Sequence, residues 1–495
     1  MTSLASPLPH TDAETHNILP VKLALVLALT ALADWLFYDQ RIGISMTLFA
    51  IALFAGSWLG NLVGLGWRRT ATAALVLFVG LVPAVEELNG LTFLFIVATL
   101  ASAISILTNP DFSRLTDGLR AFRDLYVIGP FRFIADIIRY TSRSDLTAGF
   151  AKWFAPVAFA LIFLLLFSSA NPLIEKWIKA LNPATSTFNI NLSRTLLWAL
   201  VLSMVWPFVH VRWRRRKTRA AAPIEPVADH AGPRDAALDL FSADAVLRSL
   251  ILFNLLFAVQ TVLDLVYLWA NATLPADITY ASYAHRGAYP LIVTALLAAG
   301  FVLAAMRPGG PGEKSGVIRP LVYLWVAQNV MMVASSILRL RLYVETYLLT
   351  TLRIAAFIWM VLVAVGLVLI VARIILKQSN GWLVRMNLIS LTATLYVGAL
   401  INFPAIIADY NVTHAKEASG KGVNLDINYL YALGPQALPA LTKASLLPGI
   451  NIAACGRNRL LSAQTADMAS WRSWGFRSWR LQRWLDAHPD QASAG

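Results

Sequence analysis

The chain has 495 residues, of which 58% are hydrophobic and 14% are charged. This composition is too apolar for a water-soluble globule, so we expect an all-α, polytopic membrane protein. The formal net charge of +14 does not indicate nucleic acid, because most Lys and Arg residues fall in short connections between apolar runs, where a membrane topology places them. Cys455 is the only cysteine, which excludes an internal disulfide and a thiolate metal cluster.

The first 18 residues form a polar segment that we expect in the cytoplasm. Residues 1–17 contain no Lys or Arg and precede a long apolar run. This pattern does not fit a cleavable signal peptide, so the first apolar run is expected to stay as a membrane anchor.

Eleven apolar runs approach or reach the length of about 20 residues that crosses a bilayer core. The third and fourth runs are short and are joined only by EELNG, so they form either a tight hairpin or an imperfect pair. A wrong count there would reverse every later span. The predicted spans are 19–38, 44–65, 71–86, 90–107, 153–170, 192–211, 246–269, 288–306, 319–339, 348–373 and 383–403.

Lys and Arg residues in the connections indicate the orientation, because cytoplasmic connections are enriched in them. One set of alternate connections holds the basic residues at 68–69, 114–152, 212–234, 307–319 and Lys377. The other set holds only Arg41, Lys176, Lys179, Arg286, Arg339 and Arg341. We therefore expect a cytoplasmic N-terminus and an extracytoplasmic C-terminus.

The cytoplasmic connection 109–152 contains a predicted amphipathic helix from Asp111 to Leu125. Its apolar side chains recur at helical spacing, with Arg and Asp residues on other faces. We expect this helix to lie on the inner leaflet, with anionic lipid as its partner. A second such helix begins after Gly129 and Pro130. The apolar residues are Phe112, Leu115, Leu119 and Phe122 in the first helix, and Phe133, Ile134, Ile137 and Ile138 in the second.

The remaining organisation follows from composition. Residues 212–244 are basic and then rich in Ala and Pro, so we expect a flexible linker between a six-span bundle, 19–211, and a five-span bundle, 245–403. The tail, 404–495, is expected to be helical and extracytoplasmic. If the end of the tail is a helix, one side of it holds Trp471, Trp474, Leu481, Trp484 and Leu485. This side would face either the outer membrane surface or the protein's own outer connections.

Four stretches carry a resemblance to a known family: ADWLFYDQRIGISMTLF, YAHRGAYPLIVTALLAAGFVL, LVYLWVAQNVMMVASSILRLRLYVETYLLTTLRIAAFIWM and LDINYLYALGPQALPAL. Together with YNV in the tail, they resemble the bacterial membrane family catalogued as domain of unknown function 4173. The resemblance implies a multi-pass protein of the bacterial inner membrane and implies no reaction. The sequence also lacks a zinc-protease helix motif, GxSxG and a complete phosphate loop, so no catalytic residue, cofactor or metal is predicted.

Gly56, Gly60 and Gly64 form a tandem GxxxG pattern on one face of the second span. Glycines at this spacing let two helices approach closely. The pattern predicts packing against another span of the same chain or, less often, a seam between two copies.

Charged and aromatic residues gather at the outer ends of the predicted spans. Such groups are costly in lipid and usually face each other or a water-filled cavity. They form either an internal ion-pair network, such as Asp264 with Arg353, or an outward-open ligand pocket. Asp34, Glu86 and Glu87 lie at the same level, and Asn254, Gln260, Gln328 and Asn329 lie deeper, where they can hydrogen-bond between helices. The candidate ligand-binding residues are Asp264, Tyr280, Tyr283, His285, Arg286, Arg339 and Arg353.

Three classes of function fit this pattern. The first is a non-enzymatic envelope sensor or scaffold, with lipid and a membrane or envelope protein as partners. The second is a transporter of a small molecule or lipid, which needs polar groups that continue to the inner side. The third is an enzyme acting on a lipid-linked substrate, with His285 as its acid or base. We rank the first class highest, because the charged groups cluster on one side and no inverted repeat is evident.

Overall fold

The computed structural model describes residues 12–61, 66–109, 115–133, 136, 192–211, 243–270, 300–301 and 315–489. All secondary-structure elements in these ranges are helices. The chain divides into two compact units, which are described separately below. Unit 1 comprises Met1–Lys217 and Asp467–Trp479, and unit 2 comprises Thr218–Ala466 and Arg480–Gly495. The predicted linker, 212–244, contains the boundary at Lys217 and lies almost entirely outside the described residues.

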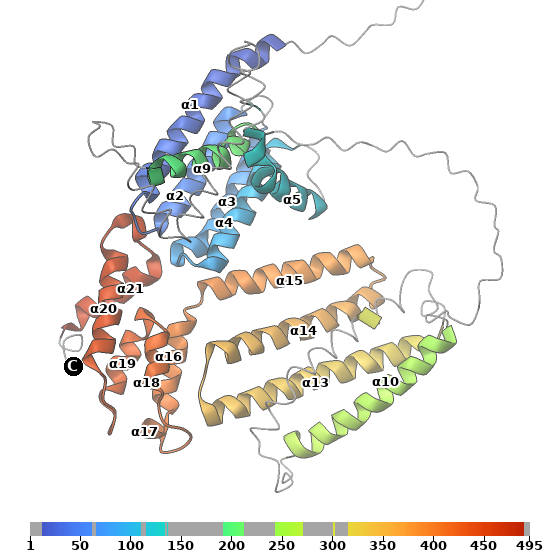
Figure 1. The fold of residues 1–495 in the computed structure, drawn as a ribbon. Helices are drawn as coiled ribbons and strands as arrows, with labels where there is room; N and C mark the ends of the chain where they lie inside the picture. The colour runs from blue at the N-terminus through green and yellow to red at the C-terminus, as the bar shows by residue number, and fades with distance from the viewer. Residues whose placement is uncertain are drawn as a thin grey trace, which may run out of the picture. The chain divides into compact units, whose positions relative to one another are not determined.

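Unit 1 is a helical bundle (Figure 1). Its helices are α1 (Asp12–Phe37), α2 (Ile44–Gly60), α3 (Trp67–Glu86), α4 (Gly90–Thr108), α5 (Leu115–Phe122), the π-helical turn η1 (Arg123–Val127) and α9 (Leu192–Val209). Helices α3 and α4 form a hairpin whose turn is fixed by Asn89, which caps α4 reciprocally with Thr92. The core is apolar and includes Val26, Leu77 and Ile104.

Close packing in unit 1 depends on the glycines of α2. Gly56 and Gly60 are buried. A Cβ atom at Gly56 would lie 2.8 Å from Leu29 Cδ1 on α1, and one at Gly60 would lie 2.8 Å from the Val209 carbonyl oxygen on α9. The prediction of packing within the chain is therefore confirmed for these two positions, whereas Gly64 lies outside the described residues.

Unit 2 contains four long helices and the larger part of the tail (Figure 1). The long helices are α10 (Ala243–Asp264), continued by the π-helical turn η3 (Leu265–Trp269), α13 (Ile318–Tyr347), α14 (Thr351–Ile375) and α15 (Asn380–Leu400). Thr350 and Ser379 cap α14 and α15 through side-chain oxygens. Helices α13, α14 and α15 run antiparallel in turn, so each packs on the next along the chain.

The tail folds into short helices, most of which contribute to an apolar core in unit 2. They are α16 (Phe403–His414), α17 (Lys416–Ser419), α18 (Ile427–Ala432), η4 (Pro435–Ala437), α19 (Leu438–Ala444), α20 (Ala454–Met468), η5 (Trp471–Ser473) and α21 (Phe476–Ala487). The predicted single helical face is wrong, because the chain leaves the helix at Trp474 and Gly475, which separates Trp471 from α21. Leu481 and Leu485 are buried in the tail core with Trp484 packed against it.

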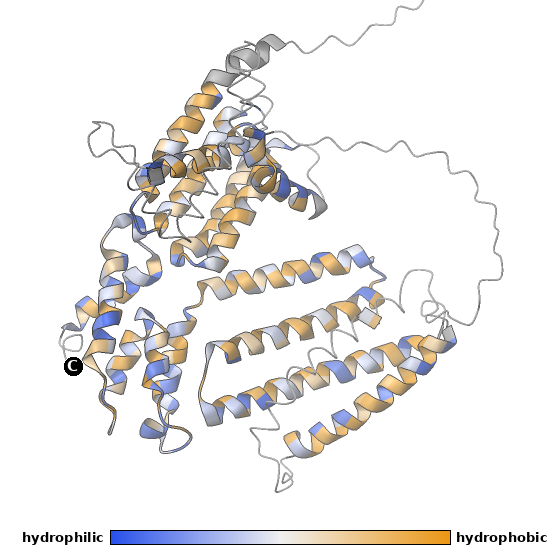
Figure 2. Cartoon of the chain, in the orientation of Figure 1, coloured by the Kyte–Doolittle hydropathy of each residue, from blue (hydrophilic) through white to orange (hydrophobic). Residues whose placement is uncertain are grey.

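Six helices of the described part are long and apolar enough to cross a membrane: α3, α4, α10 extended as Asp244–Trp269, α13, α14 and α15. The apolar helices Ile44–Gly60 and Ser193–Val209 are shorter. Large apolar side chains on these helices are exposed, for example Phe78 at 70% and Leu352 at 80%. Figure 2 shows that α14 is apolar along most of its length. Such surfaces are stable in lipid rather than in water, so the chain is a membrane protein.

The predicted span boundaries differ from the helices at several ends. Helix α13 continues to Tyr347 instead of ending at residue 339, and α2 ends at Gly60 rather than residue 65. The short third and fourth runs become helices of 20 and 19 residues joined by a tight turn. The predicted span 153–170, and 288–306 apart from Gly300 and Phe301, lie outside the described residues.

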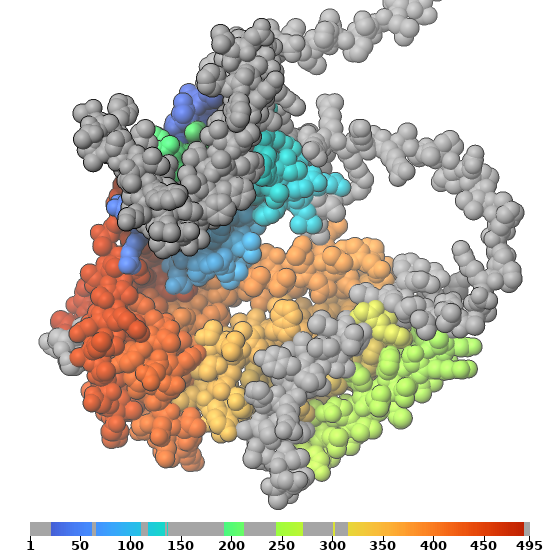
Figure 3. Space-filling view, viewed as in Figure 1, coloured from blue at the N-terminus to red at the C-terminus, as the bar shows by residue number. Residues whose placement is uncertain are grey.

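The connection that was predicted to be cytoplasmic is described from residue 115. Helix α5 and η1 form a short helical segment in which α5 packs on α4 and η1 packs on α9, and Asp124 and Leu125 of η1 are buried. Leu119 is 74% exposed and Phe122 is 40% exposed. Figure 3 shows this segment at the surface of unit 1 as cyan atoms. Its predicted start, 110–114, and most of the second predicted helix lie outside the described residues.

Candidate functional site

A buried ion pair joins α10 and α13 in unit 2. Arg339 Nη2 donates to Asp264 Oδ1, and the two residues are only 6% and 1% exposed. Gln260, one turn before Asp264, donates to the same oxygen at 2.9 Å. Asp264 is the last residue of α10 before the π-helical turn η3, and π-bulges are often found at functional sites.

The expected pairing of Asp264 with Arg353 is wrong. Arg353 lies in the first turn of α14, donates to the carbonyl oxygens of Tyr347 and Leu348, and lies 4.5 Å from the centre of the Tyr343 ring. The sequence places both arginines near the same membrane level. Helix α10 packs on α13, however, so its carboxylate meets the arginine of that helix.

Amide side chains link α10 and α13 further along the same contact. Asn254 Nδ2 donates to the Leu321 carbonyl at 3.1 Å, and Gln328 Nε2 donates to the Asn254 carbonyl at 3.3 Å. The predicted hydrogen bonds between spans are therefore confirmed for these two residues. Asn329 instead donates within α13 to the Trp325 carbonyl, and Gln260 stays within α10.

We call Asn254, Gln260, Asp264, Gln328, Asn329 and Arg339 the polar seam. Within the described part of the chain, three of its buried amide oxygens, Asn254 Oδ1, Gln328 Oε1 and Asn329 Oδ1, accept no hydrogen bond. A buried acceptor left unsatisfied costs about 1–3 kcal/mol. The seam therefore has spare acceptors for water or for a ligand that donates hydrogen bonds.

The polar seam occupies only one half of the two helices. Towards the start of α10 and α13, the buried residues are apolar, namely Val246, Leu250, Ile318 and Val322. Asn254 and Leu321 are bonded near the middle of α10, and Asp264 and Arg339 near its end. The two helices therefore run parallel, as the predicted return span between them requires.

In unit 1 the carboxylate of Asp34 binds an arginine that was not predicted to pair with it. Arg194, in the first turn of α9, donates to both carboxylate oxygens of Asp34 on α1, at 2.9 and 2.5 Å. Trp198 Nε1 also donates to Asp34 Oδ1 at 2.9 Å. Asp34 was among the charged residues predicted at the outer ends of the spans, and Arg194 was not. The available signal was a basic residue at the predicted outer end of the predicted span 192–211.

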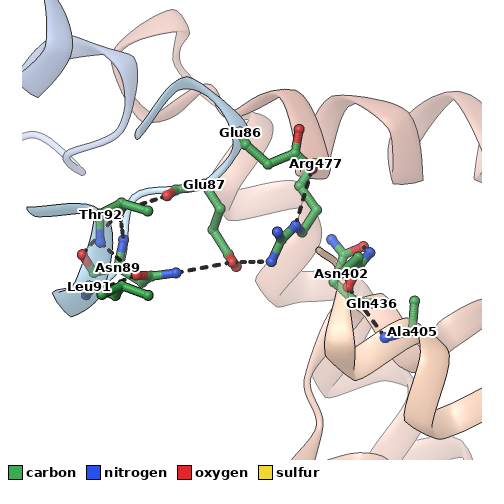
Figure 4. A network of polar contacts seen from close by, with 9 residues as sticks. All are labelled: Glu86, Glu87, Asn89, Leu91, Thr92, Asn402, Ala405, Gln436 and Arg477. Atoms are coloured by element: carbon green, nitrogen blue, oxygen red, sulfur yellow. Dashed lines mark hydrogen bonds and ion pairs between the residues drawn. The ribbon is translucent and has the colours of Figure 1, made fainter. Parts of the chain in front are cut away.

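The tail supplies the third charged contact, also within unit 1 (Figure 4). Arg477 is 4% exposed and donates through Nε to Glu86 at 3.3 Å and through Nη1 to Glu87. Glu87 also accepts from Asn89, the residue that caps α4. Both carboxylates at this turn were predicted to lie at the outer level, whereas Arg477 was not predicted to meet them.

Three of the predicted ligand-binding residues are described by the structure and four are not. Asp264 and Arg339 lie together in the polar seam, and Arg353 bonds elsewhere. Tyr280, Tyr283, His285 and Arg286 lie outside the described residues. Within the described ranges, no group of three or more His, Cys, Asp or Glu residues is placed to hold a metal ion.

Comparison with known protein families adds one finding. Residues 21–444 match the family described as domain of unknown function (DUF4153). The expected family number, 4173, is wrong, although both are families without an assigned function. No curated protein and no solved structure matches the chain.

Proposed function

This chain belongs to the family of domain of unknown function (DUF4153), and from this premise we propose that it is a multi-pass protein of the bacterial inner membrane that acts as a non-enzymatic envelope sensor or scaffold. In this proposal about eleven spans cross the bilayer, the N-terminus is cytoplasmic, and the tail after residue 403 is extracytoplasmic. The positive-inside bias supports this orientation.

Contacts of the tail also support the proposed topology. In unit 1, residues 467–479 contact two turns, because the amide of Ile44 donates to the Trp474 carbonyl at 2.9 Å and Arg477 binds Glu86 and Glu87. In unit 2, Asn411 bonds the backbone of Leu349 between α13 and α14. In a topology with eleven spans, these three turns and the tail all lie on the same side of the membrane.

The sensor or scaffold role rests on one observation, the buried contact of Arg477 with Glu86 and Glu87. Burying a cation is costly unless an anion compensates it, so this segment has a defined binding position on the α3–α4 turn. An extracytoplasmic segment held in this way offers a fixed surface to an envelope partner.

A transporter is the second candidate, because the polar seam has spare hydrogen-bond acceptors inside the span region. The seam stops near the middle of α10 and α13, and the buried positions beyond it are apolar in the described residues. This arrangement favours an outward-facing half-site over a continuous path. The enzyme alternative depends on His285, outside the described residues.

Complementation of a deletion strain distinguishes the two candidates. The tail variants Arg477→Gln and Glu86→Gln/Glu87→Gln remove the contact from either side, whereas Asp264→Asn/Arg339→Gln neutralises the seam. With equal amounts of protein in the membrane, we expect the tail variants to fail in restoring detergent resistance of the envelope and the seam variant to restore it.

Arg459→Gln is the matched control, because Arg459 is an exposed arginine of the tail. It should complement like the wild type. If the tail variants complement fully and the seam variant does not, the sensor or scaffold proposal is wrong and transport becomes the better account.

A further inference from the structure

One tail arginine differs from the other arginines near it in unit 1. Arg41 pairs with Asp467 at 3.0 Å, Arg194 with Asp34, and Arg477 with Glu86 and Glu87. Arg472, in η5, has no carboxylate partner within the residues that the structure describes. Its Nε donates to the Trp35 carbonyl oxygen at 3.1 Å, which leaves the Nη groups available for an anion.

Two tryptophans hold this guanidinium. Arg472 Cζ lies 4.6 Å from the ring centre of Trp35 and 5.1 Å from that of Trp471, and the two rings are 5.4 Å apart. Cation–π contacts and the hydrogen bond from Nε fix the plane of the guanidinium. A guanidinium fixed in this way is prepared for bidentate binding of a phosphate.

The position of the cluster indicates which phosphate it meets. Trp35 lies in the last turn of α1, and it is 55% exposed although large and apolar; Trp471 is 46% exposed. Indole rings at the end of a membrane span lie at the level of the lipid head groups. Trp35 lies at the end of the predicted span 19–38, so in that topology the exposed faces of both rings are placed to contact lipid and Arg472 is placed at the level of the phosphates.

We propose that Arg472, Trp35 and Trp471 bind the phosphate of a phospholipid in the leaflet on the side of the tail. The guanidinium donates two hydrogen bonds to the phosphate oxygens, and the indoles pack on the adjoining glycerol and acyl region. This site does not depend on the sensor or scaffold role. A phospholipid bound at this site would contact both the tail and α1.

Photo-crosslinking tests the site in the full-length protein. The protein is placed in phosphatidylcholine nanodiscs that contain a phospholipid with a photoreactive group in its head group, and crosslinked peptides are identified by mass spectrometry. We expect a crosslink in the peptide around Trp471. Arg472→Gln should reduce its yield by about tenfold, as expected for loss of a charge-assisted pair of hydrogen bonds.

Two further variants separate charge from geometry. Arg472→Lys keeps the charge but lacks the planar fork, so its yield should be intermediate. Arg459→Gln removes the same charge from another exposed site and should leave the yield unchanged.

A second measurement reports whether the tail stays in place. Trypsin cleavage after Arg477 should be equally slow in the wild type and Arg472→Gln, because Arg477 is buried against Glu86. Wild-type yield in Arg472→Gln would overturn the proposal. So would a loss of yield accompanied by fast cleavage after Arg477, which would make Arg472 a structural residue. Suppression of the crosslink by excess inorganic phosphate would assign the site to a free anion and overturn the lipid.

Discussion

Replacing Asp264 with Asn removes the carboxylate that compensates Arg339 in the polar seam. Both side chains are at most 6% exposed, so water screens their interaction little. Removing one partner of a buried ion pair typically costs about 3–5 kcal/mol. At 1.36 kcal/mol per factor of ten, this is roughly 150- to 5,000-fold in the unfolding equilibrium constant.

The double variant Asp264→Asn/Arg339→Gln should recover part of this loss, because no buried charge remains uncompensated. The corresponding double variant with Arg353→Gln should show no recovery. Arg353 bonds the carbonyls of Tyr347 and Leu348 instead, so its effect should add to that of Asp264→Asn within about 0.5 kcal/mol.

The assay is a titration with sodium dodecyl sulfate in mixed detergent micelles, which gives the free energy of unfolding for each variant. The coupling of Asp264 with Arg339 and with Arg353 then follows from two double-mutant cycles. Equal coupling in both cycles, or an Asp264→Asn variant as stable as the wild type, would refute the assignment of a buried Asp264–Arg339 pair.

Three further results are expected. Gly60→Ala should lower stability by about 1–3 kcal/mol in the same titration, because the new methyl group meets the Val209 carbonyl oxygen, whereas Gly90→Ala has open space and should be neutral; equal losses would contradict this. A spin label at Leu119 should be accessible to oxygen in lipid and a label at Arg120 to an aqueous relaxant, and water exposure at both would exclude the interfacial position. The exposed thiol of Cys455 should react with an impermeant maleimide in intact spheroplasts, and reaction only after lysis would contradict an external tail.

Local features of the helices were predictable from the sequence. The predicted span 90–107 corresponds to α4, Gly90–Thr108, and its start follows from Asn89 and Thr92 three residues apart. The apolar length is set by the bilayer and the cap by neighbouring residues, so nearby positions carry enough information. The burial of Gly56 and Gly60 was also predictable, because glycines four residues apart on one helix are a local pattern that favours close packing.

The partners of the charged groups were not predictable in the same way. Apolar runs place Asp264, Arg339 and Arg353 near one level, but they do not say which helix faces α10. Arg194 and Arg477 lie 160 and 391 positions from the carboxylates that they bind, Asp34 and Glu86. Such pairings are set by packing between elements that are distant in the sequence. A pattern in one sequence does not show which of these elements lie side by side.

The contact of Arg477 with the α3–α4 turn also has a consequence for synthesis of the chain. Arg477 follows Glu87 by 390 positions, and at about 5–20 residues per second the ribosome needs roughly 20–80 s to make the intervening chain. During this interval α3 and α4 have been synthesised, but Arg477, which binds Glu86 and Glu87 in the folded protein, has not. The contact of the tail with this turn therefore forms only after the last part of the protein has been made. A chain that is cut short before residue 477 lacks the arginine that binds Glu86 and Glu87 in the folded protein.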